Sequence, residues 1–454
     1  MKHYDAVVLG SGCGMEVVDQ AVARGLSIAL VEPGLLGGTC PNLGCIPSKM
    51  LIASADTVME QERAERLGVI SRIEHVDFAS IMIRMRASRA ESQEHMEHLL
   101  THFEGVETYR AHAAYIQPQV LQVGDDTIYG TQVFIAVGAR PLIPSIEGLE
   151  DVEYLTNESV LELTEIPESL IIIGGGYIAV EYCHFFAAMG TRVTLIEMSD
   201  RIITTEEPEI SATLQSELSK RARIVTGTMV TSVTRAGKDL RIHARSSLSG
   251  EKSRFDAQQV LVAVGRRPNA DLLRVEKADI RIDENGYIKV DSHMRTNQDN
   301  AFAVGDINGK SMFMHSANAQ ALVSAANAFD HQHVEMDYSA VPHAVYSYPQ
   351  IASVGLTEAQ ARNTDRDVIS ALTPYMRTAK GEALREEVGF TKCIMDRNSE
   401  EILGFHIIGP HAPILIQEVV NAMQSGGHLD QIARGIHIHP AMSELIPSSF
   451  EDLV

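Results

Sequence analysis

The sequence lacks any apolar run long enough to cross a membrane as a helix: its longest apolar stretches, such as residues 170–173, have the length of one strand. A spanning helix needs about 20 apolar residues, so a helical membrane span is excluded. The chain start runs straight into a predicted strand and leaves no room for a signal peptide. We therefore expect a cytoplasmic protein with no membrane partner, whose 454 residues form roughly two to four domains.

Basic residues are scarce as well. The chain has 38 Lys and Arg against 60 Asp and Glu, which gives a net charge of −22. Such a surface repels nucleic acid, and no basic run or RNA-binding signature offsets it. Lys is far scarcer than Arg, which is compatible with growth in salt or with genomic base composition. A soluble acidic surface is the simpler interpretation, because charge informs solubility rather than fold.

Cysteine is rare, and its five copies are an odd number. A cytosolic chain should not carry structural disulfides. Cys13, Cys183 and Cys393 are scattered without metal-ligand spacing, so we expect them to be small buried apolar residues. Cys40 and Cys45 lie close together, but no second pair of ligands accompanies them, so we expect no metal site.

Two stretches are each predicted to fold as strand, glycine-rich turn, helix and strand. The first comprises a strand at residues 5–9, the turn Gly10-Ser11-Gly12-Cys13-Gly14, a helix to residue 24 and a strand at 27–31 followed by Glu32. The second comprises a strand at 170–173, the turn Gly174-Gly175-Gly176, a helix over 177–188 and a strand at 192–196 followed by Glu197. Both patterns are typical of the βαβ unit that binds a dinucleotide.

Dinucleotide chemistry explains these residue types. Glycines allow a tight turn and a close approach to a pyrophosphate, which helix N-terminal amides then hold. The acid after the second strand accepts hydrogen bonds from a ribose. The first turn departs from the pattern, because Met15 occupies the position of the third glycine, which usually lets helix and strand pack closely. Gly14 could compensate only by shifting the turn, whereas Ala179 in the second motif is small enough.

Two further segments, residues 133–141 and 260–268, are similar to each other. Each is a predicted strand that ends in a glycine turn, at Gly138 or Gly265, followed by proline. One lies before the second dinucleotide motif and the other lies after it. This nesting indicates that one domain is inserted into another.

Cys40 and Cys45 lie in the segment Gly37-Gly38-Thr39-Cys40-Pro41-Asn42-Leu43-Gly44-Cys45-Ile46-Pro47-Ser48-Lys49. In a regular helix, five steps rise about 7.5 Å and turn about 140° past a full circle, so the two side chains would point apart. A disulfide needs Cα atoms about 4.4–6.8 Å apart. We therefore expect an irregular helix start, which Gly44 makes possible, and a strained bond that suits a working disulfide.

This cysteine segment and the two dinucleotide motifs together resemble the class I pyridine nucleotide–disulfide oxidoreductases, which include dihydrolipoamide dehydrogenase, glutathione reductase and mycothione reductase. The resemblance extends from Tyr4 to Glu444. It implies an α/β fold with two Rossmann-like dinucleotide-binding domains, for FAD and NAD, one inserted in the other, plus a C-terminal α+β dimerisation domain. The expected boundaries are 1–148 and 269–337 for the FAD domain, 149–268 for the NAD(P) domain and 338–454 for the interface domain.

The resemblance also implies which residues bind the cofactors, FAD and NAD(H). They are Gly10, Gly12, Gly14, Glu32, Gly38, Thr39, Lys49, Gly138, Gly174, Gly176, Tyr177, Glu181, Glu197, Gly265, Gly305 and Asp306. Among them, Asp306 would lie near the ribityl–phosphate chain and Tyr177 would cover the nicotinamide pocket. Glu181 would lie near the flavin, paired with Lys49.

Residues 439–444 are similar to the family's C-terminal signature, in which His439 would be the acid/base and Glu444 would orient it. In the implied mechanism, NADH passes hydride to FAD, and reduced flavin splits the disulfide at Cys45. Cys40 then exchanges with the substrate while His439 transfers the proton of the thiol. In this family the dyad reaches the site from the partner subunit, which implies an obligate homodimer.

The sequence offers two conflicting indications of the substrate. Glu197 favours the free 2′-hydroxyl of NAD over NADP, and Arg201 cannot outweigh it, which points to a dihydrolipoamide dehydrogenase type acting on a small disulfide or dithiol. Residues 181–190 and 433–441 are more similar to mycothione reductase, so a low-molecular-weight thiol disulfide reductase is the alternative. A third alternative is a subunit of a 2-oxoacid dehydrogenase complex that acts partly through binding.

Three further sequence features concern mercuric reduction and the roles of two histidines. Mercuric reductase is not expected, because the C-terminal region has no cysteine pair to pass on a metal. His315 is as compatible with packing or helix capping as with catalysis. His437 is expected to be structural.

Overall fold

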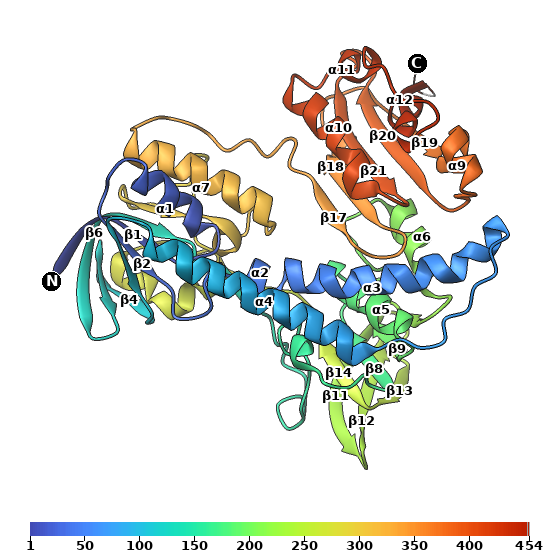
Figure 1. The fold of residues 1–454 in the computed structure, drawn as a ribbon, viewed down its shortest axis with the longest axis horizontal. Coiled ribbons are helices and arrows are strands. Elements are labelled where there is room, and N and C mark those ends of the chain that lie inside the picture. Colours follow the sequence, from blue (N-terminus) through green and yellow to red (C-terminus); the bar gives the residue numbers. More distant parts are fainter. Residues whose placement is uncertain (452, 454) are drawn as a thin grey trace. The chain divides into compact units, whose positions relative to one another are not determined.

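The structure is a computed structural model that describes residues 1–451 and residue 453. The chain forms two units. Unit 1 comprises Met1–Met50, Met82–Leu142 and Gly265–Met336, and unit 2 comprises Leu51–Ile81, Ile143–Val264 and Asp337–Val454. Figure 1 follows the chain by colour through both units. Among the described residues, none of the helices combines the length and the apolar character that a bilayer crossing requires.

Unit 1 is built on a seven-stranded sheet around the parallel strand β1 (Lys2–Leu9). The order is β3 (Val106–Tyr109), β2 (Ile28–Val31), β1, β6 (Asp126–Ile135), β5 (Val120–Val123) and β4 (Ala113–Gln117), with β16 (Ala301–Ala303) also paired to β6. Helices α1 (Gly14–Val22) and α7 (Met314–Phe329) pack against each other beside this sheet (Figure 1). The apolar run at the end of β1 is buried, as expected for a central parallel strand.

Unit 2 contains a four-stranded parallel sheet. Its order is β10 (Arg223–Val225), β9 (Arg192–Ile196), β8 (Ser169–Ile173) and β14 (Gln259–Val262). Helix α5 (Tyr177–Ala188) follows β8, and α6 (Pro208–Leu218) follows β9. A three-stranded antiparallel sheet adds β11 (Thr228–Ala236), β12 (Asp239–Ser246) and β13 (Lys252–Ala257).

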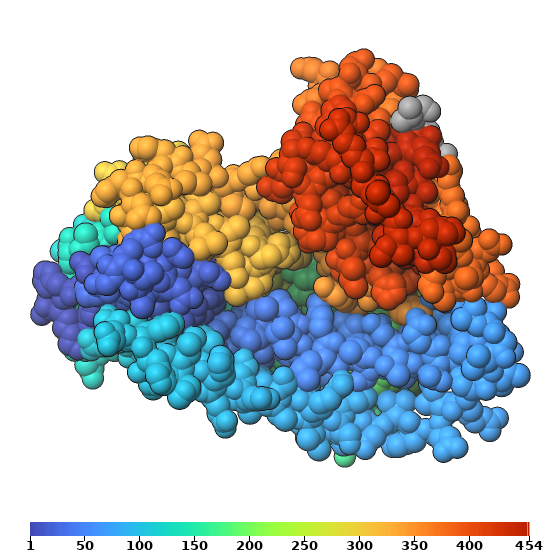
Figure 2. Space-filling model, turned by 45° about the horizontal axis from the view of Figure 1, so that its top comes forward, coloured from blue at the N-terminus to red at the C-terminus, as the bar shows by residue number. Residues whose placement is uncertain are grey.

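The C-terminal part of unit 2 is a five-stranded antiparallel sheet with helices, the α+β arrangement that was expected. The order is β17 (His343–Val345), β18 (Ile351–Gly355), β21 (Ile402–Ile408), β20 (Phe390–Asp396) and β19 (Val368–Pro374). Its helices are α8 (Glu358–Ala361), α9 (Ala379–Ala383), α10 (Ala412–Gln424), α11 (Asp430–Ala433) and α12 (Leu445–Glu451). The last three lie together at its surface, in red in Figure 2.

The two similar segments predicted from the sequence meet in unit 1. They form β7 (Ala139–Pro141) and β15 (Arg266–Pro268), which pair antiparallel with each other. The Leu142 amide also donates to the Gly265 carbonyl at 3.0 Å, at the points where the chain leaves and re-enters unit 1. The chain between β7 and β15 therefore forms an insertion, which confirms that one nucleotide domain is inserted in the other.

Residues 51–81, predicted to lie in the first domain, are part of unit 2, and the predicted domain boundaries stay a prediction. Within unit 2, Asp56 accepts a hydrogen bond from His184 at 2.9 Å and Arg63 binds Glu386 at 3.0 Å. Helix α3 (Cys45–Arg63) has 19 residues and is about 28 Å long, and it begins in unit 1 and ends in unit 2. Helix α4 (Phe78–Thr101) carries the chain back.

Candidate functional site

The first glycine-rich turn joins β1 to α1. Gly10 has a φ of +99°, and a Cβ there would lie 2.4 Å from the carbonyl oxygen of Ala136 on the neighbouring strand's continuation. A Cβ on Gly14 would lie 2.8 Å from Cγ1 of Val8. Gly14, rather than residue 15, therefore provides the close helix–strand approach, which resolves the departure seen in the sequence.

Glu32 follows β2 and faces this turn. Its Oε2 accepts hydrogen bonds from the amide of Ser11 at 3.0 Å and from its hydroxyl at 2.8 Å, while Oε1 accepts from the Gly34 amide at 2.9 Å. The Ser11 hydroxyl in turn accepts from the Gly37 amide at 3.0 Å. Ser11 thus connects the acid to the start of the cysteine segment. Sequence reasoning missed this role, for which the only signal was its place between two glycines.

The cysteine segment packs directly on the first turn. Gly38 has a φ of +69°, and a Cβ there would lie 2.8 Å from Cα of Gly12. The buried Asn42 amide donates to the carbonyls of Leu36 and Gly38, each at 2.8 Å. Gln93 on α4 donates to Oδ1 of Asn42 at 2.7 Å. These contacts fix the segment against the nucleotide turn. Gln93 was not predicted, because no motif includes it.

Cys40 and Cys45 lie on either side of a break in the helix. Helix α2 (Thr39–Leu43) stops before Gly44, whose φ of −138° and ψ of −110° are not helical, and α3 begins at Cys45. Cys40 is half-buried and Cys45 is exposed. A hydrogen bond with Cys45 and burial raise the pKa of the Cys40 thiol, while the charge of Lys49 opposes this shift. The irregular helix start therefore brings the two sulfurs together next to a lysine.

The other three cysteines are buried, as expected. Burial raises the pKa of the Cys13 thiol to about 12 and that of Cys183 to about 12, and it raises the pKa of Cys393 as well. Burial also separates these three thiols from any substrate, whereas Cys40 is half-buried and Cys45 exposed, so Cys40 and Cys45 remain the candidate redox pair.

Asp306 lies in the 3₁₀ helix Gly305–Asn308 after β16. Burial raises the pKa of its carboxyl, although Arg266 opposes the shift with its Nε 3.2 Å from Oδ2. Oε1 of Gln320 accepts from the Gly305 amide at 2.8 Å and from the Asn308 side chain at 2.7 Å. These bonds hold the acid in place within unit 1.

The second glycine-rich turn, between β8 and α5, repeats the design of the first. Gly174 has a φ of +115°, and a Cβ there would lie 2.3 Å from the carbonyl oxygen of Ala263. A Cβ on Gly175 would lie 2.8 Å from Cγ of Glu197, so the acid lies directly against the turn. At Gly176 a Cβ would meet no atom within 4 Å.

Glu197 and Arg201 have different partners. Oε1 of Glu197 accepts a hydrogen bond from the Ser199 amide at 2.7 Å. The Arg201 guanidinium donates to the backbone carbonyls of Glu206 and Thr204, both at 2.8 Å. Arg201 is therefore engaged with the backbone of its own loop.

Glu181 and Tyr177 lie on α5. Glu181 is buried, and its Oε1 accepts from the Tyr346 amide at 2.9 Å. Tyr177 is the first residue of the helix and is partly buried. Lys49 belongs to unit 1 and Glu181 to unit 2, so their pairing stays a prediction.

Three remaining predicted site residues lie in unit 1. Gly138, Gly265 and Gly305 all adopt positive φ values, of +62°, +138° and +78°. The first two form the turns that precede β7 and β15. His315 lies on the first turn of α7 and stacks on Phe313 at 5.7 Å between ring centroids, a packing contact.

His439 and Glu444 form a hydrogen-bonded pair in unit 2. Nδ1 of His439 lies 2.8 Å from Oε1 of Glu444, and the Ala441 amide donates to Oε2 at 2.9 Å. The Ala441 amide and His439 together lower the pKa of the Glu444 carboxyl. The His439 side chain is 71% exposed. His437 forms a similar pair with Glu418 at 2.7 Å.

Both glycine turns fit a dinucleotide. At Gly176 and Gly12 a Cβ would meet nothing closer than 3.8 Å, so the protein's own packing does not require glycine there. A bare backbone at a helix N-terminus leaves amides open to a pyrophosphate. An acid lies next to each turn to accept from a ribose.

Comparison with known proteins identifies the family. Residues 4–321 match the pyridine nucleotide-disulphide oxidoreductase family, and residues 341–449 match the dimerisation domain of the same family. The chain belongs to this family of FAD-dependent oxidoreductases that use NAD(P)H. The dimerisation domain supports a homodimer.

Individual relatives carry different activities. A dihydrolipoyl dehydrogenase from Bacillus subtilis (strain 168) is 32% identical, with 98% of this chain and 96% of the relative covered. A mycothione reductase from Mycobacterium tuberculosis is also 32% identical, with 99% of each chain covered. The structure of the HOCl-induced flavoprotein disulfide reductase RclA from Escherichia coli, as a Cu(II) complex, is 26% identical with a TM-score of 0.89 over 100% of both chains.

The two outer glycines of the second turn should respond differently to alanine. We expect Gly174→Ala to lower the free energy of unfolding by about 2 kcal/mol or more, because the new Cβ meets a carbonyl and the backbone is left-handed. Gly176→Ala should change it by no more than about 0.5 kcal/mol. Urea unfolding followed by circular dichroism measures both. Equal losses would contradict the geometry of the turn.

Proposed function

We propose that the protein is an FAD-dependent dithiol–disulfide oxidoreductase of the dihydrolipoyl dehydrogenase type, which couples NAD(H) to a small disulfide through Cys40 and Cys45. The observation that carries this proposal is the contact between the two thiols across the helix break at Gly44. FAD bound at the first turn would carry the electron pair between NAD(H) and the cysteines.

The proposed reaction proceeds by thiol–disulfide exchange. The Cys40–Cys45 disulfide accepts two electrons and one proton, which together equal the hydride given up by NADH, and becomes a Cys45 thiolate and a Cys40 thiol. Cys40 attacks one sulfur of the substrate disulfide, and the other sulfur leaves as a thiol after taking a proton. Cys45 then attacks the mixed disulfide at Cys40, which releases the second thiol and restores the starting bond.

His439 is suited to supply that proton from a second copy of the chain. Glu444 accepts from Nδ1, which fixes the tautomer and leaves Nε2 for the substrate. The high exposure of His439 in the single chain is consistent with a group that acts in a neighbouring copy. The lowered pKa keeps the Glu444 carboxylate ionised at neutral pH.

NAD rather than NADP is supported by the second turn. Glu197 lies against Gly175, where the adenine ribose is expected, and its charge would repel a 2′-phosphate. Arg201, the nearby basic residue, is occupied by two backbone carbonyls. NAD preference favours the dihydrolipoyl dehydrogenase type.

The alternative is a reductase of a low-molecular-weight thiol disulfide. The equal identity to a dihydrolipoyl dehydrogenase and a mycothione reductase supports neither over the other. A subunit of a 2-oxoacid dehydrogenase complex would catalyse the dihydrolipoyl dehydrogenase reaction but would be part of a large assembly. Size fractionation of a native lysate distinguishes a free dimer from such a complex.

Replacement of Cys45 tests the redox pair. We expect Cys45→Ser to lower NADH-dependent disulfide reduction by about 10³-fold or more, because a hydroxyl cannot form the bond. The absorbance of bound FAD should persist, since the first turn is unchanged. Full turnover in the variant would refute the mechanism.

The two histidine pairs provide a matched test of the dyad. We expect His439→Gln to lower kcat for disulfide reduction by about 10²-fold or more, because the proton donor is lost. His437→Gln, which breaks the similar pair with Glu418, should change kcat by less than about threefold. Both are measured by steady-state turnover. Similar losses in both variants would indicate a structural effect instead.

Cofactor and substrate choice are tested by turnover with NADH and NADPH against lipoamide, glutathione disulfide and other thiol disulfides. We expect kcat/KM for NADH to exceed that for NADPH by about tenfold or more, and Glu197→Ala to lower the NADH value by about tenfold through loss of a charged hydrogen bond. A strong preference for NADPH would contradict the role of Glu197.

A further inference from the structure

The loop between β9 and α6 returns to the second glycine-rich turn. The Ile203 amide donates to the carbonyl of Gly175 at 2.7 Å. Ile203 has a φ of +39°, a conformation that β-branched residues rarely adopt, and it is buried. A strained residue therefore makes the contact that fixes the middle of the turn, and its surroundings must hold it there.

Hydrogen bonds close the loop of residues 201–206 into a small ring, the 201–206 ring. The Glu206 amide donates to the Ile203 carbonyl at 2.9 Å. Arg201 donates to the carbonyls of Thr204 and Glu206 from the other side. The conformation of Ile203 thus depends on where the backbone of Glu206 is held.

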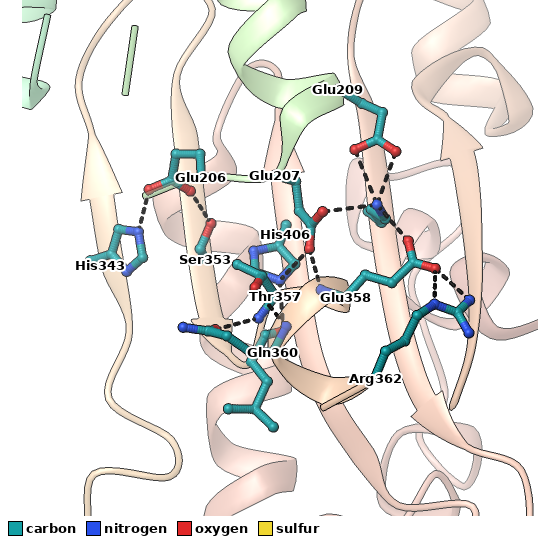
Figure 3. A network of polar contacts seen from close by, with 12 residues as sticks. Glu206, Glu207, Glu209, His343, Ser353, Thr357, Glu358, Gln360, Arg362 and His406 are labelled. Carbon is teal, nitrogen blue, oxygen red and sulfur yellow. Dashed lines mark hydrogen bonds and ion pairs between the residues drawn. The ribbon is translucent and has the colours of Figure 1, made fainter. Parts of the chain in front are cut away.

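The Glu206 side chain is anchored in the C-terminal part of unit 2 (Figure 3). One carboxylate oxygen lies 2.5 Å from Nε2 of His343 on β17, and the other accepts from the Ser353 hydroxyl on β18 at 2.6 Å. His343 and Ser353 face each other in the strand register. Burial raises the pKa of the Glu206 carboxyl, but His343, Ser353 and His406 together outweigh burial, so the pKa is lowered.

A second anchor lies beside the first and differs from it. Lys392 on β20 binds Glu207 at 2.9 Å, Glu209 at 3.0 Å and Glu358 at 2.8 Å (Figure 3). This cluster holds the start of α6. Glu209 has no bond with the 201–206 ring among the contacts described, so it provides a matched control.

We propose that Glu206 is a positioning residue for NAD(H) binding. Glu206 holds the strained Ile203 in place, so that the Ile203 amide fixes the Gly175 carbonyl. The inference rests on the proposed function, in which the second turn binds the dinucleotide. Without the anchor, the ring relaxes and only part of the population has a turn ready to bind. Apparent affinity then falls by that fraction, while a bound complex reacts normally.

The test is steady-state oxidation of NADH by the FAD-loaded homodimer with ferricyanide as acceptor, which does not depend on the identity of the disulfide. We expect Glu206→Ala to raise KM for NADH by about tenfold with kcat within about twofold. Glu206→Gln, which keeps the length and can bond both anchors, should recover most of the affinity. Glu209→Ala should leave KM within about twofold.

Ser353→Ala covers the case in which Glu206→Ala does not fold, because it removes one anchor bond and leaves the carboxylate in place. We expect it to raise KM for NADH by about threefold. Wild-type turnover with an unchanged KM in the folded anchor variants would overturn this inference alone. An equal rise in KM for Glu209→Ala would also overturn it. Absence of NADH oxidation by the wild-type enzyme would overturn the proposed function together with the inference.

Discussion

The close approach of a glycine to a neighbouring strand is the constraint from which both candidate nucleotide sites are built. Gly10 and Gly174 each lie where a Cβ would be within 2.4 Å of a carbonyl oxygen, of Ala136 and Ala263 respectively. Only a residue without a side chain can turn there. A helix begins directly after each turn, and the acid that follows the second strand lies beside the turn. The same packing rule therefore places amides and acids in each unit.

The proposed redox pair is positioned by contacts with the first of these turns. Gly38 lies on Gly12, and the Asn42 and Gln93 amides secure the backbone that leads to Cys40. The Cys40 and Cys45 side chains are within hydrogen-bonding reach of each other across the helix break. Contacts of the backbone, rather than of the sulfurs, therefore position the pair, which suits a disulfide proposed to open and close in each cycle.

Features with short, fixed spacing could be predicted from the sequence. The two βαβ units, the helix break at Gly44 and the contact of His439 with Glu444 each depend on residues within about 30 positions. Contacts between residues far apart in the sequence could not be predicted, because no periodic pattern in the sequence indicates which residues meet. The bond from Gln93 to Asn42 spans 51 residues, and residues 51–81 join unit 2 through partners far along the chain. The register of the turn determines which residue of the helix start lies against strand β1, and this residue is Gly14 in place of residue 15.

The buried acids of unit 2 are better explained by position than by stability. A left-handed β-branched residue costs on the order of 1–3 kcal/mol, and a hydrogen bond to a charged group contributes about 1.5–3 kcal/mol. The two bonds of Glu206 can therefore offset the strain at Ile203, but burial of the carboxylate consumes much of the remainder. An apolar contact would stabilise the fold as well. What a carboxylate adds is direction: it bonds one strand pair at a single point and so determines where the Ile203 amide lies.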